Sequence, residues 1–205
     1  MLRFDIEQLT EEWFQIRCGK ITASKVQDIL AEKAGRKNYI AELVCERLTE
    51  EPVTLGFTSK EMQWGTDHEE EARAAYEFDR DVNVVSVGFA IHPELEWAGA
   101  SPDGLVGDDG CVQIKCPNTA THIETIRTDK VPLKYAAQMQ WEMACAERQW
   151  CDYVSYDPRI KLPGLVLYVQ RIPRDEAFIK TATSKLFIAN LEIDKIVAEL
   201  KEKAG

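Results

Sequence analysis

Apolar residues recur at helical spacing through most of the N-terminal part of the chain, which predicts helices there. Two helix-start signals support this. Thr10 stands where an N-cap residue would precede a helix, and Ser24 to Gln27 matches a capping box. The predicted helices span Glu11–Arg17, Ser24 to about Ala34, Asn38–Thr49 and Lys60–Phe78, with a loop over 51–60.

Further along the chain the pattern changes to short Val-rich runs between turn residues, which indicates strands. The predicted strands span Val82–Ile91, Ala98–Val106, Cys111–Cys116, Trp150–Tyr156 and Leu165–Arg171. Three more helices are predicted at Thr121–Arg127, Leu133–Ala146 and Asp175–Lys203. Helices flanking a mixed sheet are typical of an α/β or α+β fold. No linker composition interrupts the chain, so residues 1–205 are expected to form one domain.

The composition narrows the class of protein. Hydrophobic residues make up 45% of the chain, but no apolar run is long enough for a membrane span, and no secretory signal opens the chain. A cytoplasmic location is therefore expected. The net charge of −10 argues against a protein that coats nucleic acid, since such affinity comes largely from Lys and Arg. It leaves room for a nuclease, because carboxylates bind metals and a local basic groove can coexist with an acidic surface.

The strongest chemical signal is a predicted hairpin around the turn residues 107–110. If the turn is centred on Asp108, Asp103 lies directly opposite Gln113. Lys115 is two residues further along the same strand, so its side chain faces the same way as that of Gln113. The hairpin is therefore expected to gather these three side chains on one face of the sheet.

Such a cluster suits phosphodiester hydrolysis. Carboxylate oxygens bind Mg²⁺, a hard cation, which activates water and stabilises charge on the phosphate. A neighbouring ammonium group can position or help deprotonate that water. Asp103, residue 113 and the backbone carbonyl of Ile114 are the candidate metal ligands, and Lys115 is the candidate catalytic ammonium.

Six motifs resemble those of the phage lambda exonuclease family, the YqaJ-type viral recombinases of the PD-(D/E)xK nuclease superfamily. They occur in the family's order and with similar spacing. They are Trp13-x-x-x-Arg17-x-Gly19-x-Ile21-Thr22-Ala23-Ser24, Trp64-Gly65 with Glu69, Ser101-Pro102-Asp103-Gly104, Lys115-Cys116-Pro117, Ala137-Gln138-Met139-Gln140 and Tyr156-Asp157-Pro158-Arg159. The likeness spans nearly the whole chain.

The resemblance implies a central mixed sheet flanked by helices and a 5′-to-3′ exonuclease on linear double-stranded DNA. It implies Mg²⁺, with Mn²⁺ as a substitute and two ions per site, and a preference for 5′-phosphorylated ends. The expected product is a 3′ overhang for a single-strand annealing recombinase. It also implies a homotrimer encoded by a phage or prophage and acting in the bacterial cytoplasm. No GxxxxGK[ST] loop is present, so ATP is not expected to be needed.

Gln113 departs from the family, which has Glu at this position. Gln has the shape of Glu but is neutral, and its amide nitrogen cannot ligate a cation. Metal affinity and water activation are therefore expected to be impaired. Our hypothesis is that Gln113 marks an engineered inactive variant that holds intact DNA; a natural inactive homologue is the alternative.

The resemblance also implies roles for residues outside the hairpin. Glu69 would reach the metal site, although its position also allows an i,i+4 pair with Arg73. Gln138 would lie near the attacking water, whereas Gln140 faces elsewhere. Arg17, Thr22 and Ser24 would form a pocket for the 5′-phosphate; the alternative is a helix cap beside a surface arginine. Arg159 is either structural or part of the DNA path.

Two other functions remain open. A PD-(D/E)xK endonuclease, of the restriction or junction-resolving kind, would share the fold but would cut closed circular DNA. A non-catalytic DNA-end binding module would bind duplex ends without producing fragments, and Gln113 is the feature that favours it.

Overall fold

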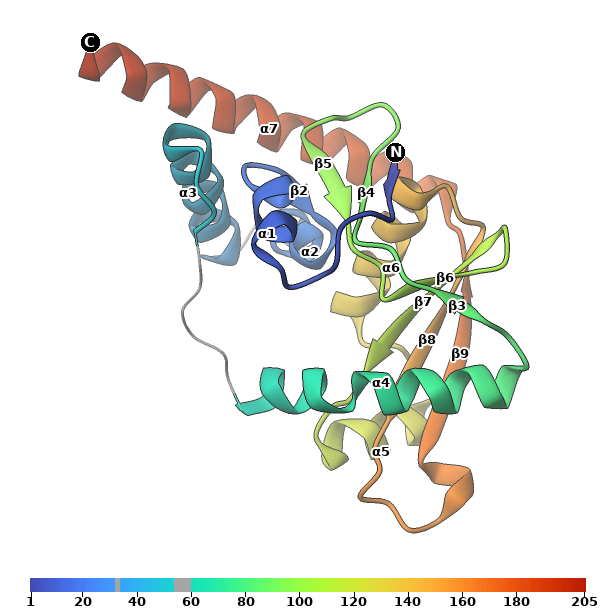
Figure 1. Cartoon of the computed structure of the whole chain (residues 1–205). Helices are drawn as coiled ribbons and strands as arrows, with labels where there is room; N and C mark the ends of the chain where they lie inside the picture. Colours follow the sequence, from blue (N-terminus) through green and yellow to red (C-terminus); the bar gives the residue numbers. More distant parts are fainter. Residues whose placement is uncertain (32–33, 54–59) are drawn as a thin grey trace.

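The computed structural model describes residues 1–31, 34–53 and 60–205, and it shows two mixed β-sheets with helices packed around them (Figure 1). The α-helices of the described residues are α1 (Glu11–Arg17), α2 (Val26–Leu30), α3 (Ala34–Thr49), α4 (Lys60–Arg80), α5 (Thr119–Thr128), α6 (Leu133–Ala146) and α7 (Glu176–Ala204). The predicted mixed α+β class is confirmed. None of the described helices is long and apolar enough to cross a membrane.

The larger sheet has five strands in the order β3-β6-β7-β8-β9. The strands are β3 (Val84–Val85), β6 (Gly104–Val106), β7 (Gly110–Lys115), β8 (Trp150–Tyr156) and β9 (Leu167–Pro173). β7 and β8 run parallel, and the other neighbours are antiparallel. In the β6–β7 hairpin Gly104 pairs with Val112 and Leu105 with Cys111, so the predicted register is confirmed.

The smaller sheet has four strands in the order β1-β4-β5-β2. They are β1 (Leu2–Arg3), β2 (Ile21–Thr22), β4 (Phe89–Ile91) and β5 (Ala98–Ala100). The predictions of single strands over Val82–Ile91 and Ala98–Val106 are wrong, because each run divides between the two sheets.

The chain passes from one sheet to the other between β3 and β4 and again between β5 and β6, and the residues at these two points fit the break in pairing. Pro102, between β5 and β6, has no N–H to donate to a ladder. Gly88 precedes β4, and a Cβ there would lie 2.1 Å from the backbone oxygen of Ile6. The strands β1 and β2 were not predicted, because two residues are too few to show an alternating pattern.

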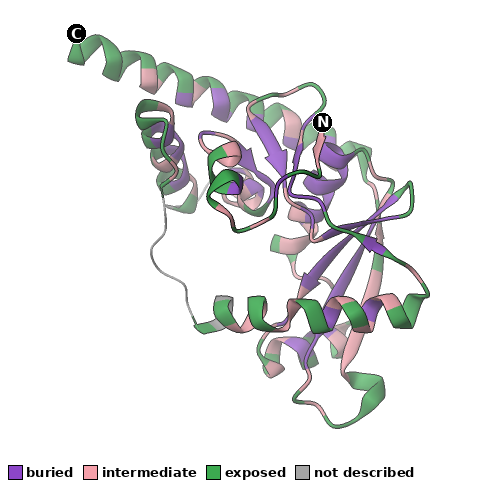
Figure 2. Ribbon diagram, in the orientation of Figure 1, coloured by how far each residue is buried: buried purple, intermediate pink, exposed green. Residues whose placement is uncertain are grey.

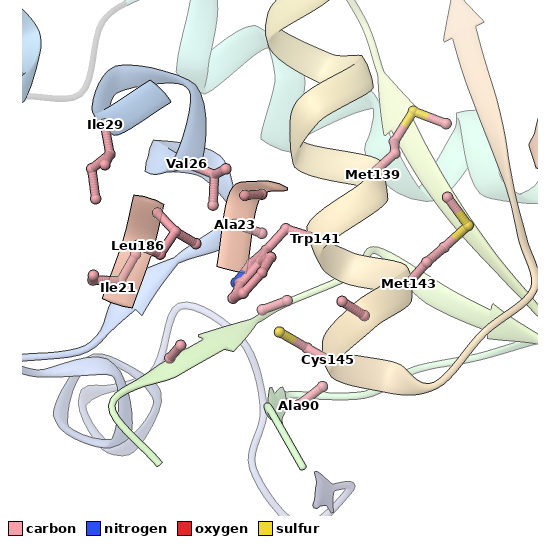
Figure 3. Packing of buried hydrophobic residues seen from close by; sticks show 14 of the residues in the cluster. Ile21, Ala23, Val26, Ile29, Ala90, Met139, Trp141, Met143, Cys145 and Leu186 are labelled. Carbon is pink, nitrogen blue, oxygen red and sulfur yellow. The ribbon is translucent and has the colours of Figure 1, made fainter. Parts of the chain in front are cut away.

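Helix α6 contacts both sheets, and Figure 3 shows its buried side chains from close by. It packs against β4 and β5 of the smaller sheet and against β7 and β8 of the larger one. Trp141 points from one side of the helix towards Ile21 and Leu186, while Met139 and Met143 point from the other side. Figure 2 shows buried residues concentrated in α6 and the strands, whereas the outer end of α7 is exposed. The second half of α6, from Met139 to Ala146, is therefore buried, while its first half carries the half-buried Gln138 to the candidate site.

The predicted capping box at Ser24 is wrong. Ser24 lies inside a 3₁₀ turn, η1 (Ala23–Lys25), and α2 begins only at Val26, without a side-chain cap. A tight turn leads the chain into the short helix, so Ser24 is not at the N-cap position. By contrast, Thr10 caps α1 by accepting a hydrogen bond from the Trp13 backbone N–H. Most of the predicted loop over 51–60 lies outside the described residues.

Gly104 shows why a glycine follows Asp103. A Cβ at this position would lie 2.1 Å from Val84 Cγ1, on a stiff β-branched side chain. We therefore expect Gly104→Ala to lower the free energy of unfolding by about 1–3 kcal/mol through overpacking. Chemical denaturation measures this change. Gly65→Ala is the control, because its Cβ would meet nothing within 4 Å; an equal loss in both variants would contradict the packing explanation.

Candidate active site

The β6–β7 hairpin brings Asp103, Gln113 and Lys115 together. Asp103 Oδ2 accepts a hydrogen bond from the Ile114 backbone N–H at 2.6 Å and another from Gln113 Nε2. Lys115 Nζ lies 3.8 Å from the same oxygen. Gln113 is completely buried, while Lys115 and Asp103 are partly exposed. The contact expected from the register is therefore present.

The cluster borders a cavity of about 900 Å³ between the hairpin, α4, α5 and α6. Its lining combines residues from segments far apart in the sequence: Ser24, Lys60, Trp64, Gly65, Thr66, Glu69, Ile114, Lys115, Cys116, Pro117, Asn118, Thr121, Lys134, Tyr135, Gln138 and Arg159. Four of these residues are basic and only Glu69 is acidic. The cavity is thus locally basic in a chain whose net charge is −10.

Glu69 forms the i,i+4 pair considered from the sequence and also faces the cavity. Its carboxylate lies 3.6 Å from Arg73 as an i,i+4 pair on α4, and the residue also lines the cavity. Burial, and then the charge of Asp103, raise the pKa of Glu69. Arg73 in turn donates a hydrogen bond to the backbone oxygen of Asp103 at 2.9 Å. Glu69 is therefore a carboxylate that α4 holds beside the hairpin.

Gln138 also reaches the hairpin. Its Nε2 donates to Gln113 Oε1 at 2.5 Å and to Glu142 Oε1 at 2.8 Å. Gln140 faces elsewhere, as expected, and donates to the backbone oxygen of Pro173. Glu142 was not predicted from the sequence, although its position one turn after Gln138 was a signal that the two side chains could meet.

Acidic groups surround the Lys115 ammonium group. Burial alone would lower the pKa of Lys115, but the negative charges of Asp103, Glu142 and Glu69 contribute to a net rise above its usual value. Lys115 therefore stays protonated at neutral pH and supplies a fixed positive charge beside Asp103.

The oxygen donors fit a hard divalent cation in kind, but they are few. Asp103 and the Ile114 carbonyl are the groups that would bind it directly, and the Glu69 carboxylate lies near them. Among the described residues, no three acidic, His or Cys side chains gather closely enough to hold a metal by themselves. Gln113 directs an N–H group at Asp103, where a cation would need an oxygen. A carboxylate at position 113 would complete the donor set.

Arg17, Thr22 and Ser24 are less closely gathered than the resemblance implied. Arg17 Nη1 donates to Ser101 Oγ at 2.9 Å, and its guanidinium lies 3.9 Å from the centre of the Trp13 ring. Burial lowers the pKa of Arg17 to about 10, so it remains charged at neutral pH. Thr22 is buried, and its backbone N–H donates to the Tyr39 hydroxyl.

Of these three residues, Ser24 lines the cavity, and it is exposed. Ser101, which was not predicted as a site residue by itself, connects Arg17 to the segment that carries Asp103. Ser101 Oγ also accepts a hydrogen bond from Trp13 Nε1 at 2.9 Å.

Arg159 both lines the cavity and has structural contacts. It donates to the buried carboxylate of Asp157 at 2.7 Å and to the backbone oxygen of Pro117 at 2.8 Å. Its guanidinium stacks over Trp64 at 4.4 Å. These contacts hold a cationic group at the cavity wall.

Known proteins share this sequence pattern and this fold. Residues 12–149 match the YqaJ-like viral recombinase domain. No curated protein matches the chain significantly. An alkaline exonuclease from Laribacter hongkongensis, LHK-Exo, is 47% identical, with a TM-score of 0.90 over 95% of this chain and 98% of that chain.

Two further structures extend the likeness. LHK-Exo in complex with dAMP gives a TM-score of 0.91 at the same identity and coverage. A phage related exonuclease from Haemophilus somnus 129PT has a TM-score of 0.65 at 18% identity, covering 88% of this chain and 96% of that chain. At that identity, the likeness concerns the fold alone.

Proposed function

Since the chain belongs to the YqaJ-like viral recombinase family, as its motifs predicted, we propose that it is an exonuclease that degrades linear double-stranded DNA from a 5′ end. The observation that carries this proposal is the contact of Asp103, Gln113 and Lys115 at the edge of a basic cavity. The likeness to an alkaline exonuclease over almost the full length of both chains supports a nuclease role on DNA.

The charge of the cavity supports a nucleic acid substrate. Lys60, Lys115, Lys134 and Arg159 line it, and cationic side chains attract DNA phosphates. Because the whole chain is acidic, this local excess of positive charge would direct DNA to the cavity rather than to the rest of the surface.

The side chains divide the work of cleaving a phosphodiester bond. A divalent cation, Mg²⁺ or Mn²⁺, would supply an activated water and offset charge on the phosphate when bound by Asp103, the Ile114 carbonyl and a carboxylate at position 113. Lys115 places a positive charge beside the reacting phosphate and can orient the water. Gln138, which contacts residue 113, restricts where that side chain can lie.

A 5′ end is the favoured point of attack. Arg17 is held by Trp13 and Ser101 next to the segment that carries Asp103, so it can bind a terminal phosphate close to the cation site. LHK-Exo is known in complex with dAMP, a mononucleotide of the kind that stepwise removal of nucleotides releases. Ser24, which lines the cavity, and Thr22, which is buried, are included in this proposal.

Arg17→Ala is expected to reduce the preference for 5′-phosphorylated over 5′-hydroxyl ends by about tenfold or more, because a charge-assisted hydrogen bond is worth about 1.5–3 kcal/mol. Competition between the two kinds of duplex in one digestion measures the ratio. Arg127→Ala is the control, since Arg127 is exposed and pairs only with Glu124 among the described residues. An unchanged preference in Arg17→Ala would remove Arg17 from this role.

The proposal is tested with linear and covalently closed circular duplexes, using the Gln113→Glu protein and Mg²⁺. An exonuclease degrades the linear duplex, leaves a 3′ overhang and spares the circle. Digestion of the circle would instead establish an endonuclease. No digestion of either substrate, together with binding to duplex ends, would favour the non-catalytic module.

We further propose that the Gln113 form is an inactivated variant. In this form Gln113 itself hydrogen-bonds Asp103, so the two side chains satisfy each other without a cation. The remaining features that we carry over from the family are two cations per site, a homotrimer, action without ATP and an annealing recombinase that receives the 3′ overhang. Sedimentation measurements test the homotrimer, and pull-down with an annealing protein tests the recombinase partner.

A further inference from the structure

Glu142 is a buried acid next to the candidate active site. It lies on α6 one turn after Gln138, and its side chain is completely buried. Oε1 accepts a hydrogen bond from Gln138 Nε2 at 2.8 Å, whereas Oε2 has no hydrogen-bond partner among the described residues. Burying a carboxyl group with incomplete hydrogen bonding is unfavourable. Glu142 therefore costs stability where it stands.

The other buried acids of the described chain are better paired. Glu46 accepts hydrogen bonds from the backbone N–H groups of Gly19 and Val53 through its two oxygens. Asp152 accepts hydrogen bonds from Arg171 and from Tyr76, and Asp157 is paired with Arg159. These acids have an evident structural role. Glu142 differs from them in that its one described hydrogen bond leads to the active site.

The hydrogen bonds of Glu142 continue as a relay. Gln138 Nε2 is shared between Glu142 Oε1 and Gln113 Oε1, and Gln113 Nε2 donates in turn to Asp103. A carboxylate oxygen accepts hydrogen bonds, so Glu142 orients the Gln138 amide with its nitrogen towards the carboxylate. The nitrogen of Gln138 then requires an oxygen from residue 113. The carbonyl oxygen of Gln138 is left on the other side of its amide group, and Gln138 lines the cavity.

We propose that Glu142 is a positioning residue that fixes the orientation of the Gln138 amide and, through it, the side chain at position 113. Its catalytic consequence rests on the proposed nuclease function, whereas the hydrogen-bond relay itself does not. With a carboxylate at position 113, the same arrangement would keep one oxygen on Gln138 and turn the other towards Asp103. Glu142 thereby orders the side chain at position 113, although the described hydrogen bonds connect the two residues only through Gln138.

The relay is tested first in the Gln113 protein without metal, by the NMR signals of the side-chain amides. Glu142→Met removes the acceptor, so it should shift the amide signals of both Gln138 and Gln113. Glu142→Gln keeps an oxygen acceptor and should shift them less. In a Gln138→Ala background, Glu142→Met should leave the Gln113 signal unchanged. A Gln113 signal that responds equally with and without Gln138 would overturn the relay.

The catalytic consequence is tested in the Gln113→Glu background. Glu142→Met should lower kcat about 10- to 100-fold, the usual cost of losing a residue that orients a metal-site ligand. KM should change little, because Glu142 is buried and is not among the cavity-lining residues. Glu142→Gln should keep most of the kcat that Glu142→Met loses. The double variant Glu142→Met with Gln138→Ala should lose no more kcat than Gln138→Ala alone. Additive losses, or equal losses in Glu142→Met and Glu142→Gln, would overturn the positioning role.

Thermal melting separates positioning from folding. Replacing an incompletely paired buried acid by Met should leave Tm unchanged or raise it, so activity and stability would change in different directions. Glu46→Met is the matched control, and it should lower Tm because it leaves two backbone N–H groups without their acceptor. A fall in Tm for Glu142→Met as large as that for Glu46→Met would assign Glu142 a structural role instead. Failure of Gln113→Glu to cut DNA, with the NMR coupling intact, would contradict only the nuclease function.

Discussion

Gln113→Glu is expected to increase Mg²⁺-dependent digestion of linear duplex DNA by a hundredfold or more. In the Gln113 form the amide nitrogen of this residue donates to Asp103, which leaves the site one oxygen ligand short. A carboxylate at this position turns that attraction into repulsion between two acids, which a divalent cation relieves. Metal ions contribute several kcal/mol to catalysis, and each 1.36 kcal/mol is a factor of ten in rate.

The same substitution should make thermal stability depend on Mg²⁺. Without metal, Gln113→Glu should lower Tm because two carboxylates come into contact, and millimolar Mg²⁺ should restore it by binding only the folded state. Gln149→Glu is the control, because it adds one negative charge at an exposed position before β8. If the Gln113 protein digests DNA as fast as Gln113→Glu, the assignment of position 113 is wrong.

Lys115→Met, made in the Gln113→Glu background, is expected to lower kcat by about 10²- to 10³-fold, the range seen when one group that stabilises transition-state charge is lost. Lys134→Met is a closely matched control. Both lysines line the cavity and lie over the ring of Tyr135, at 5.5 Å for Lys115 and 4.5 Å for Lys134. Only Lys115 pairs with Asp103, at 3.8 Å.

We expect Lys134→Met to weaken DNA binding and to reduce its salt dependence, with kcat almost unchanged, since Lys134 would contact only phosphates. Initial rates at saturating DNA and binding titrations at several salt concentrations measure the two effects. Equal losses of kcat in the two variants would contradict the special role of Lys115.

The hairpin was predictable because its signals are local. The turn residues 107–110 fix the register of β6 and β7, and the register decides that Asp103 meets Gln113. The amphipathic helices α3 and α4 were predictable for the same reason, since their spacing is a property of consecutive residues.

What could not be predicted depends on contacts between distant segments. The change of sheet between β5 and β6 follows from tertiary pairing with β2 and β3, which no local pattern reveals. Ser24 matched a capping box, yet the chain enters α2 through a 3₁₀ turn. Ser101 was not singled out, because its contact with Arg17 arises only when α1 meets the segment before the hairpin. Glu142 could have been paired with Gln138 from its helical spacing, but its complete burial beside the hairpin depends on tertiary packing.

The central claim is that Asp103, a carboxylate at position 113 and the Ile114 carbonyl hold a divalent cation beside Lys115. It is tested most directly by crystals of the Gln113→Glu protein soaked with Mn²⁺, using anomalous scattering to locate the ion. Our account predicts an anomalous peak within about 2.0–2.6 Å of oxygens from these three residues. A protein that digests DNA but shows its only peak elsewhere, or none between Asp103 and position 113, would contradict it.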